Sequence, residues 1–214
     1  FKVTTIGYSN DYKSEEEYYA DDFFGRRASL SVSGQLEGEV AAMAFGKIYT
    51  FGPSFRAEKS NTPRHVAEFW HVEPEVAFAE LPDIIEIAEA LIKHIIKTVL
   101  EKCPEELKFF DKHFENGLVE KLTAVANHDF AIMTYTEAIE KLKASGKEFK
   151  YPVEWGLDLM TEHERYISEE VCKKPVFLTD YPKDIKSFYM KQNPDGKTVA
   201  ATDLLVPGVG EIIG

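Results

Sequence analysis

The chain has 214 residues, of which 44% are hydrophobic and 29% charged, and its formal net charge is −12 at pH 7. This apolar fraction is enough for one globular core and excludes a disordered chain, while the negative charge disfavours binding of bulk nucleic acid or anionic membrane without excluding a local basic pocket. The longest apolar run is far shorter than the roughly 20 residues that span a bilayer, so we expect no membrane segment.

The first half of the chain predicts strands and helices in a clear order. We expect a strand over residues 28–34, a helix over 36–45, strands over 47–58 and 67–80, and a helix over 82–102. Gly34 and Gly46 mark the ends of the first two elements. Pro82 and Asp83 are typical of the first turn of a helix.

The second half predicts helices first and strands afterwards. Thr134 and Glu137 have the spacing of a capping box, as do Thr161 and Glu164, so each pair predicts a helix start. We further expect a strand over residues 175–182 and a hairpin over 187–207, with its turn at 193–196. Long helices follow pairs of strands, which favours an α+β fold with a mainly antiparallel sheet flanked by helices.

The two strands over residues 47–58 and 67–80 each have an apolar side and a polar side, because successive side chains of a strand point to opposite faces. The polar sides carry Thr50, Ser54, Arg56 and Glu58 on the first strand, and Phe69, His71, Glu73 and Glu75 on the second. One interpretation is a half-exposed sheet with a solvated face. A ligand site is the alternative, because the ring of Phe69 gains nothing from water and the face is short of cations.

A ligand with both anionic and cationic groups would balance this polar face. Arg64 and His65, in the loop between the strands, suit an anion together with Arg56. Asp203 is expected at the end of a strand, and Glu211 follows a glycine-flanked turn. Two such carboxylates near a polyphosphate are suited to Mg²⁺, which takes few protein ligands; the alternative is that both are ordinary surface acids.

Three longer segments carry a resemblance to a known family. Residues 55–75, FRAEKSNTPRHVAEFWHVEPE, closely resemble motif 2 of class II aminoacyl-tRNA synthetases, in the form found in the asparaginyl enzymes. SVSGQLEGE from Ser31 and VAATDLLVPGVGEIIG from Val199 are similar to segments of the same family. The resemblance covers the whole chain. It implies the catalytic fold of this family, incomplete at both ends, with core over residues 1–102 and 152–214 and a helical insertion over 103–151.

The resemblance implies an asparagine–tRNA ligase. Asparagine and ATP would give asparaginyl-adenylate with the help of Mg²⁺, and the asparaginyl group would then pass to tRNA(Asn). A homodimer is implied for the complete protein, and a cytoplasmic location is expected. Cys103 and Cys172, far apart and without metal-like spacing, agree with reduced thiols of an intracellular protein.

The resemblance also implies a role for each site residue. For ATP, Arg56 looks like the α-phosphate ligand, Arg64 and His65 look like β- and γ-phosphate partners, and Phe69 looks like the platform under adenine. Glu58 looks like a contact to the adenosine or the tRNA end, and Asp203 and Glu211 look like the Mg²⁺ carboxylates next to ATP. For the amino acid, Ser33 and Gln35 look like contacts to the α-amino group, and Glu73 looks like the acceptor of the asparagine amide. Tyr181, Phe188 and Tyr189 could line the pocket or pack in the core.

Gly38 and Glu73 favour asparagine over aspartate as the substrate. The aspartyl relatives carry a lysine at the position of Gly38, which would pair with a substrate carboxylate, and losing that cation while keeping an acceptor favours a neutral amide. Two alternatives remain: an aspartate-activating relative (an aspartyl-tRNA synthetase or an ammonia-dependent asparagine synthetase), and a synthetase-like paralogue without catalysis. The chain lacks motif 1, motif 3 and the anticodon-binding domain of the family, so we expect weak substrate binding by this segment alone.

Overall fold

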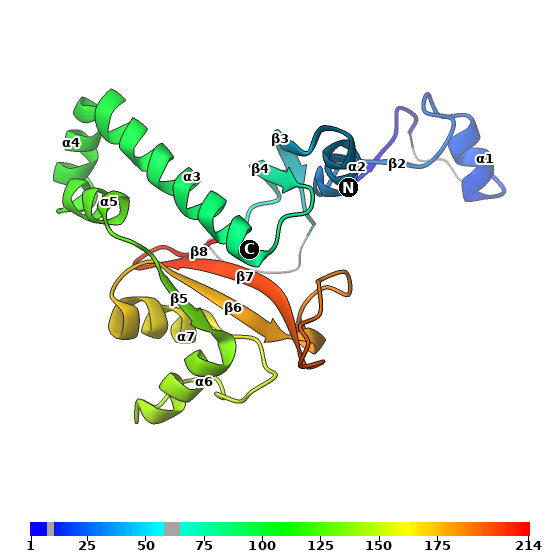
Figure 1. Cartoon of the computed structure of the whole chain (residues 1–214). Helices are drawn as coiled ribbons and strands as arrows, with labels where there is room; N and C mark the ends of the chain where they lie inside the picture. Colours follow the sequence, from blue (N-terminus) through cyan, green and yellow to red (C-terminus); the bar gives the residue numbers. More distant parts are fainter. Residues whose placement is uncertain (8–10, 58–64) are drawn as a thin grey trace. The chain divides into compact units, whose positions relative to one another are not determined.

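The computed structural model describes residues 1–7, 11–57 and 65–214. The chain divides into two compact units, Phe1–Ala79 and Glu80–Gly214. Unit 1 contains β1 (Lys2–Val3), α1 (Glu15–Ala20), β2 (Ala28–Ser29), α2 (Gln35–Phe45), β3 (Lys47–Phe55) and β4 (Glu68–Val76). Unit 2 contains α3 (Leu81–Lys102), α4 (Pro104–His113), α5 (Leu118–Asn127), β5 (Ala131–Thr134), α6 (Tyr135–Ala144), α7 (Thr161–Arg165), β6 (Val176–Pro182), β7 (Thr198–Val206) and β8 (Gly210–Ile213) (Figure 1).

Unit 1 is built around the antiparallel pair of β3 and β4, as the alternating sequence predicts. The register places Thr50 opposite Glu73 and Gly52 opposite His71. The helix α2 precedes β3 and packs against both strands. It ends at Gly46, whose φ of 83° is a conformation that glycine adopts without strain.

Unit 2 is built around a four-stranded sheet in the order β5-β6-β7-β8. The β6–β7 and β7–β8 pairs are antiparallel, whereas β5 runs parallel to β6. Figure 1 shows α6 and α7 on one side of this sheet and α3 on the other. The sheet is therefore covered on both faces, and its central strand β6 is buried along most of its length.

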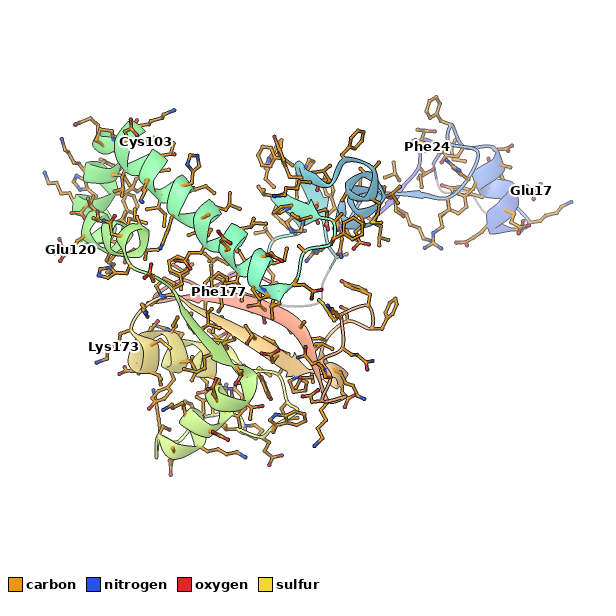
Figure 2. All side chains as sticks on the ribbon, viewed as in Figure 1. Glu17, Phe24, Cys103, Glu120, Lys173 and Phe177 are labelled. Atoms are coloured by element: carbon orange, nitrogen blue, oxygen red, sulfur yellow. The ribbon has the colours of Figure 1, made fainter. Side chains whose placement is uncertain are left out.

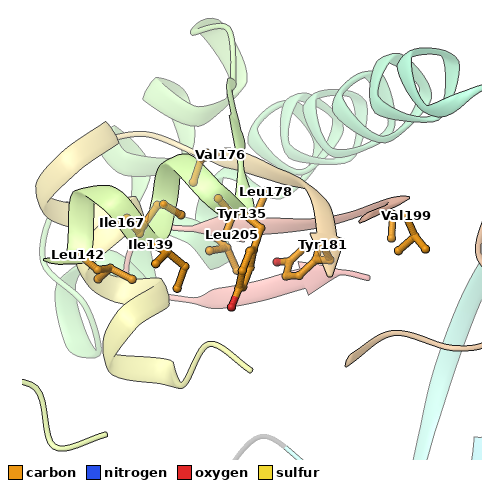
Figure 3. Close-up of a cluster of buried hydrophobic side chains, with 11 residues drawn as sticks. Tyr135, Ile139, Leu142, Ile167, Val176, Leu178, Tyr181, Val199 and Leu205 are labelled. Carbon is orange, nitrogen blue, oxygen red and sulfur yellow. The ribbon is translucent and has the colours of Figure 1, made fainter. Parts of the chain in front are cut away.

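Alternate residues of β6 pack into two separate hydrophobic cores. Val176 and Leu178 pack against α6 in one cluster, which Figure 3 shows. Phe177 points to the opposite face, where it joins residues of α3 and lies 6.0 Å from the ring of Phe130 (Figure 2). A strand buried on both faces needs apolar residues at every position, which explains the continuous apolar run at the start of β6.

The helix starts at residues 81 and 135 follow the expected capping chemistry. Glu80 N donates to Asp83 Oδ2 over 2.8 Å, and Pro82 occupies the first turn of α3. At α6, Thr134 N donates to Glu137 Oε2 over 2.8 Å and Glu137 N donates to Thr134 Oγ1 over 3.2 Å. This second pair is the predicted capping box, and it places the helix boundary where the sequence puts it.

The capping box expected at Thr161 and Glu164 is wrong. The helix α7 already includes Thr161, and Met160 N donates to Nδ1 of His163 over 3.1 Å. His163 is 1% exposed, so its burial decides where this helix starts. The chain then continues as a π-helical segment, Tyr166–Cys172.

Three further expectations about strands need correction. The strand expected over residues 28–34 is reduced to β2, because Ser31 Oγ donates to the carbonyl of Ser33 over 2.7 Å and turns the chain locally. The stretch 103–151 is not wholly helical, since it contains β5. The hairpin expected over residues 187–207 keeps its turn, in which Gly196 N donates to the carbonyl of Asn193, but β7 pairs with β6 and the first arm forms one isolated bridge.

Candidate functional site

The polar face of the β3–β4 pair is shielded, and its apolar face is exposed. On the apolar face, Tyr49 is 71% and Trp70 68% exposed. On the polar face, Ser54 is 3% exposed and the side chain of Glu73 12%. A solvated polar face would show the opposite pattern, so the structure argues against the first interpretation of this sheet.

Two glycines bring the segment before β3 close to the polar face. A Cβ added at Gly34 would lie 2.7 Å from Thr50 Oγ1, and one added at Gly38 would lie 3.1 Å from Glu75 Cγ and 3.3 Å from Ile48 Cδ1. Gly38 is therefore packed closely against the sheet. A larger side chain there would require its neighbours to move, which adds a steric reason to the electrostatic one for the absence of a lysine.

Glu73 is the centre of a hydrogen-bond network on this face. Its Oε2 accepts from Gly34 N and from Thr50 Oγ1, each over 2.9 Å. Its Oε1 accepts a short hydrogen bond from Ser33 Oγ and lies 3.1 Å from Nδ1 of His71. A carboxylate offers about four acceptor positions, so the chain supplies a neighbour for each of them.

This network keeps Glu73 ionised. Burial by itself would raise the pKa of its carboxyl group, but the hydrogen bonds from Ser33, Gly34 and Thr50 and the charge of His71 outweigh burial and hold that pKa below its usual value. Glu75 lies two residues further along β4, and burial together with the charges of Glu39 and Glu73 raises its pKa. The pKa values of the two glutamates on this face are therefore shifted in opposite directions, because hydrogen-bond donors surround Glu73.

Arg56 and Phe69 lie together on the polar face. The guanidinium carbon of Arg56 is 5.3 Å from the centroid of the Phe69 ring, within the range of a cation–π contact. Arg56 Nε also donates to the carbonyl of Val32 over 3.2 Å. The ring of Phe69 therefore has a charged group as a neighbour.

The structure describes some, but not all, of the other site residues expected in unit 1. Ser33 contacts Glu73, and Gln35 donates through Nε2 to Glu39 Oε1 over 3.0 Å, so both side chains already have polar partners. His65 is exposed at the edge of the described chain. Glu58 and Arg64 lie outside the described residues.

Asp203 and Glu211 approach each other in unit 2. A Cβ added at Gly214 would collide with Glu211 Oε1 and lie 3.4 Å from Asp203 Oδ1, so both carboxylates border the same small space. Asp203 lies inside β7 rather than at its end, and Glu211 lies on β8 just after the turn. The expectation that Asp203 ends a strand is therefore wrong, although the two acids do come together.

Two oxygen donors of this kind fit Mg²⁺, which binds through one or two carboxylates and keeps several waters. No group of three or more His, Cys, Asp or Glu side chains with metal-binding geometry occurs within residues 1–7, 11–57 and 65–214. The donor set is therefore suited to a metal that completes its coordination with water and with oxygens of a substrate.

Of Tyr181, Phe188 and Tyr189, only Tyr181 packs in a core. Tyr181 is 5% exposed, whereas Phe188 is 98% and Tyr189 54% exposed. Burial raises the pKa of Tyr181 well above its usual value, and the neighbouring carboxylates of Asp203, Glu164 and Glu211 add to that increase. Packing in the core is thus wrong for Phe188 and Tyr189.

Sequence reasoning gave no role to Thr50, His71 or Lys186. Thr50 and His71 have the strand parity of the polar face, which could have indicated their place beside Glu73. Lys186 pairs with Asp203, as its Nζ lies 2.8 Å from Oδ2. The two residues are distant in sequence, and no pattern in the chain indicates this pairing.

Comparisons with known proteins show the family and the fold of the chain. Residues 1–214 match the family model described as tRNA synthetases class II (D, K and N). The chain is 61% identical over 216 residues to the asparagine–tRNA ligase of Clostridium novyi and 60% identical to that of Bacillus cytotoxicus, covering 100% of this chain and 47% of each relative. The solved asparaginyl-tRNA synthetase from Pyrococcus horikoshii, complexed with asparaginyl-adenylate, superposes with a TM-score of 0.78 at 39% identity, over 89% of this chain and 42% of that one.

The chain spans about half the length of the curated relatives it matches. Among the described residues, none of the helices is both long enough and apolar enough to cross a membrane.

Proposed function

The chain belongs to the class II tRNA synthetases of the D, K and N group, and from this premise we propose that its protein is an asparagine–tRNA ligase. Its fold is the α+β catalytic fold of that class. The proposed reaction uses ATP to activate asparagine and then transfers the asparaginyl group to tRNA(Asn). The proposal includes a cytoplasmic location and a homodimer of the complete protein.

The observation that carries the proposal is the hydrogen-bonded carboxyl group of Glu73 on a shielded polar face. Its carboxylate is held by donors from Ser33, Gly34 and Thr50. A fixed negative charge attracts an amide N–H₂ and repels a carboxylate, so it selects asparagine over aspartate. Because each acceptor position of Glu73 already has a neighbour, the substrate amide has to replace one of them. His71 is suited to this, since its side chain is 30% exposed.

In the first step, an oxygen of the asparagine carboxylate attacks the α-phosphorus of ATP. A new P–O bond forms, the bond to the β-phosphate oxygen breaks, and pyrophosphate leaves. Negative charge grows on the α-phosphate, and the guanidinium of Arg56 is proposed to stabilise it. The contact between Arg56 and Phe69 supports this assignment, because a ligand base stacked on Phe69 would place its phosphate within reach of the same guanidinium.

Asp203 and Glu211 are proposed to hold Mg²⁺. The ion, when bound, neutralises phosphate charge and orients the polyphosphate. The convergence of both carboxylates on the space beside Gly214 supports this role. Glu58, Arg64 and His65 are proposed to contact the adenosine and the outer phosphates, and Ser33 and Gln35 the α-amino group.

In the second step, a hydroxyl of the terminal ribose of tRNA(Asn) attacks the carbonyl carbon of the adenylate. The ester bond forms, the bond between the carbonyl carbon and the phosphate oxygen breaks, AMP leaves with that electron pair, and the hydroxyl proton passes to the departing phosphate. In this step the residues around Glu73 keep the asparaginyl side chain in the same position, so that one binding site serves both reactions.

Amino-acid-dependent ATP–pyrophosphate exchange by the intact protein tests the proposal. We expect exchange with asparagine and a much lower rate with aspartate. Exchange with aspartate alone would assign the protein to the aspartate-activating relatives instead. No exchange with either amino acid, from a folded protein, would leave the non-catalytic paralogue.

A further inference from the structure

Lys186 lies on one of the two carboxylates assigned to the metal. Its Nζ is 2.9 Å from Asp203 Oδ1 and 2.8 Å from Asp203 Oδ2, so a single ammonium group contacts both oxygens. The two side chains are only 22% and 13% exposed. An exposed ion pair contributes little, but a shielded and hydrogen-bonded pair costs much more to separate.

The position of Lys186 is fixed from a second side by Tyr181. The ammonium lies 4.1 Å from the centroid of the Tyr181 ring, which is a close cation–π contact. Tyr181 packs against Tyr135 with 5.4 Å between ring centroids, and both belong to the buried cluster in Figure 3. Ile185 also packs against this cluster, so both the ring and the backbone next to Lys186 are anchored in the core.

Several carboxylates lie around Tyr181 and Lys186 in unit 2. Asp203, Glu164 and Glu211 all act on the hydroxyl of Tyr181. Lys186 supplies a positive charge directly on Asp203. A divalent cation at Asp203 and Glu211 would bind oxygens that the ammonium group already contacts. Each oxygen can accept more than one partner, but the two cations repel each other, so the ammonium group opposes metal binding at Asp203.

We propose that Lys186 is an exchangeable counter-ion of the metal site, whose ammonium neutralises Asp203 until a divalent cation replaces it. This inference rests on the proposed function, which assigns Mg²⁺ to Asp203 and Glu211. Lys186 is then a positioning residue: it keeps the Asp203 carboxylate in place and sets the metal concentration at which the site fills. Removing its charge makes the metal bind more tightly.

Direct binding of Mn²⁺ to the intact protein, followed by the electron paramagnetic resonance signal of the free ion, tests this without any turnover. Lys186→Met keeps the length of the side chain and removes its charge. We expect its Mn²⁺ dissociation constant to fall by about tenfold, the effect of losing one competing charged hydrogen-bonded pair. Lys186→Arg keeps a cation beside Asp203, and its constant is expected to stay within about twofold of the wild type.

Lys183→Met is the matched control, because Lys183 Nζ donates to the carbonyl of Gly196 over 2.9 Å and, among the residues that the structure describes, not to a carboxylate. Its Mn²⁺ affinity is expected to match that of the wild type. Asp203→Asn identifies the site, because it should abolish the binding that Lys186→Met strengthens. If the methionine variant does not fold, Lys186→Gln offers the same comparison with an uncharged hydrogen-bond donor.

Two failures can be told apart. Equal or weaker Mn²⁺ binding by a folded Lys186→Met protein, together with normal asparagine-dependent exchange, would overturn the counter-ion role alone. Mn²⁺ binding that Asp203→Asn leaves unchanged, or no binding by any of the proteins, would overturn the metal assignment and the counter-ion role with it.

Discussion

Thr50 and Glu73 stand opposite each other on β3 and β4, and Thr50 Oγ1 donates to Glu73 Oε2 over 2.9 Å. The antiparallel register therefore positions the acceptor that we assign to the substrate amide. Gly34 N reaches the same oxygen from the segment before α2, also over 2.9 Å. Two parts of unit 1, β3 and the segment before α2, thus converge on a single carboxylate of β4.

Glu73→Gln is expected to lower asparagine-dependent exchange. The amide keeps one acceptor oxygen but turns an N–H₂ group toward donors such as Gly34 N and Thr50 Oγ1, so hydrogen bonds are lost along with the charge. A lost charge-assisted hydrogen bond of about 1.5–3 kcal/mol corresponds to a fall in kcat/KM of roughly 10- to 160-fold. Exchange kinetics with varied asparagine measure it.

Glu68→Gln is the matched control for this change, because Glu68 is exposed at the start of β4. It should leave exchange within about twofold of the wild type, as expected of a surface substitution. Equal losses of exchange activity in both variants would show that removing any negative charge from β4 has this effect, whatever the position of Glu73.

The lowered pKa of Glu73 also predicts a pH-dependent stability. A carboxyl group whose pKa is lower in the folded protein than its usual 4.5 stabilises the fold above that pH, and this contribution disappears as the pH falls through the folded-state pKa. The difference in free energy of unfolding between the wild type and Glu73→Gln should therefore be largest near neutral pH and shrink below about pH 4. Urea unfolding at pH 7, 5, 4 and 3 measures it, and a difference that grows on acidification would contradict the ionised state of Glu73.

The alternation of side chains along the two strands predicted much of unit 1, and it did so for a physical reason. Alternation along residues 47–58 and 67–80 fixes which side chains share a face, so Arg56, Phe69 and Glu73 could be grouped from sequence. Parity does not say which face is covered, because that depends on where α2 packs, and the exposed rings of Tyr49 and Trp70 were therefore unexpected.

Contacts between residues that are far apart along the chain could not be predicted from the sequence. The parallel pairing of β5 with β6 leaves no turn signal between the strands. The pairing of Lys186 with Asp203 depends on the path of the chain after β6. Local capping signals worked at Thr134, but at Thr161 a buried histidine two residues later decided the helix start.

Gly34→Ala tests the close approach of the chain to Glu73. The new methyl group would lie 2.7 Å from Thr50 Oγ1, so the segment has to move away and the hydrogen bond from Gly34 N to Glu73 lengthens. A shift costing about 1–3 kcal/mol would raise the KM for asparagine roughly 5- to 160-fold. Gly52→Ala is the control, because a Cβ at Gly52 has nothing within 4 Å. Similar effects of the two changes on KM would contradict the steric argument.

Tyr135→Phe tests a buried polar contact in the core of unit 2. Tyr135 is 0% exposed, and its hydroxyl donates to the carbonyl of Leu157 over 2.7 Å and accepts from Gly156 N over 3.0 Å. Removing the hydroxyl leaves both backbone groups without this partner, so the free energy of unfolding should fall by about 1–3 kcal/mol. Thermal or urea unfolding measures it. Tyr151→Phe, at a 43% exposed position, should change stability by less than about 0.5 kcal/mol, and a larger loss there would mean that burial does not explain the effect.

Arg56→Lys separates the geometry of the cation from its charge. The guanidinium contacts the Phe69 ring and the carbonyl of Val32 at once. A lysine keeps the positive charge but has no planar fork to contact two oxygens of the α-phosphate, so the transition state loses more than the bound substrates do. We expect kcat of exchange to fall by about 10²- to 10³-fold, with a much smaller change in KM for asparagine. Arg27→Lys, at an exposed position of the same unit, should leave both constants unchanged. If Arg56→Lys raised KM with kcat intact, Arg56 would contribute to ground-state binding, and its assigned role at the α-phosphate would be wrong.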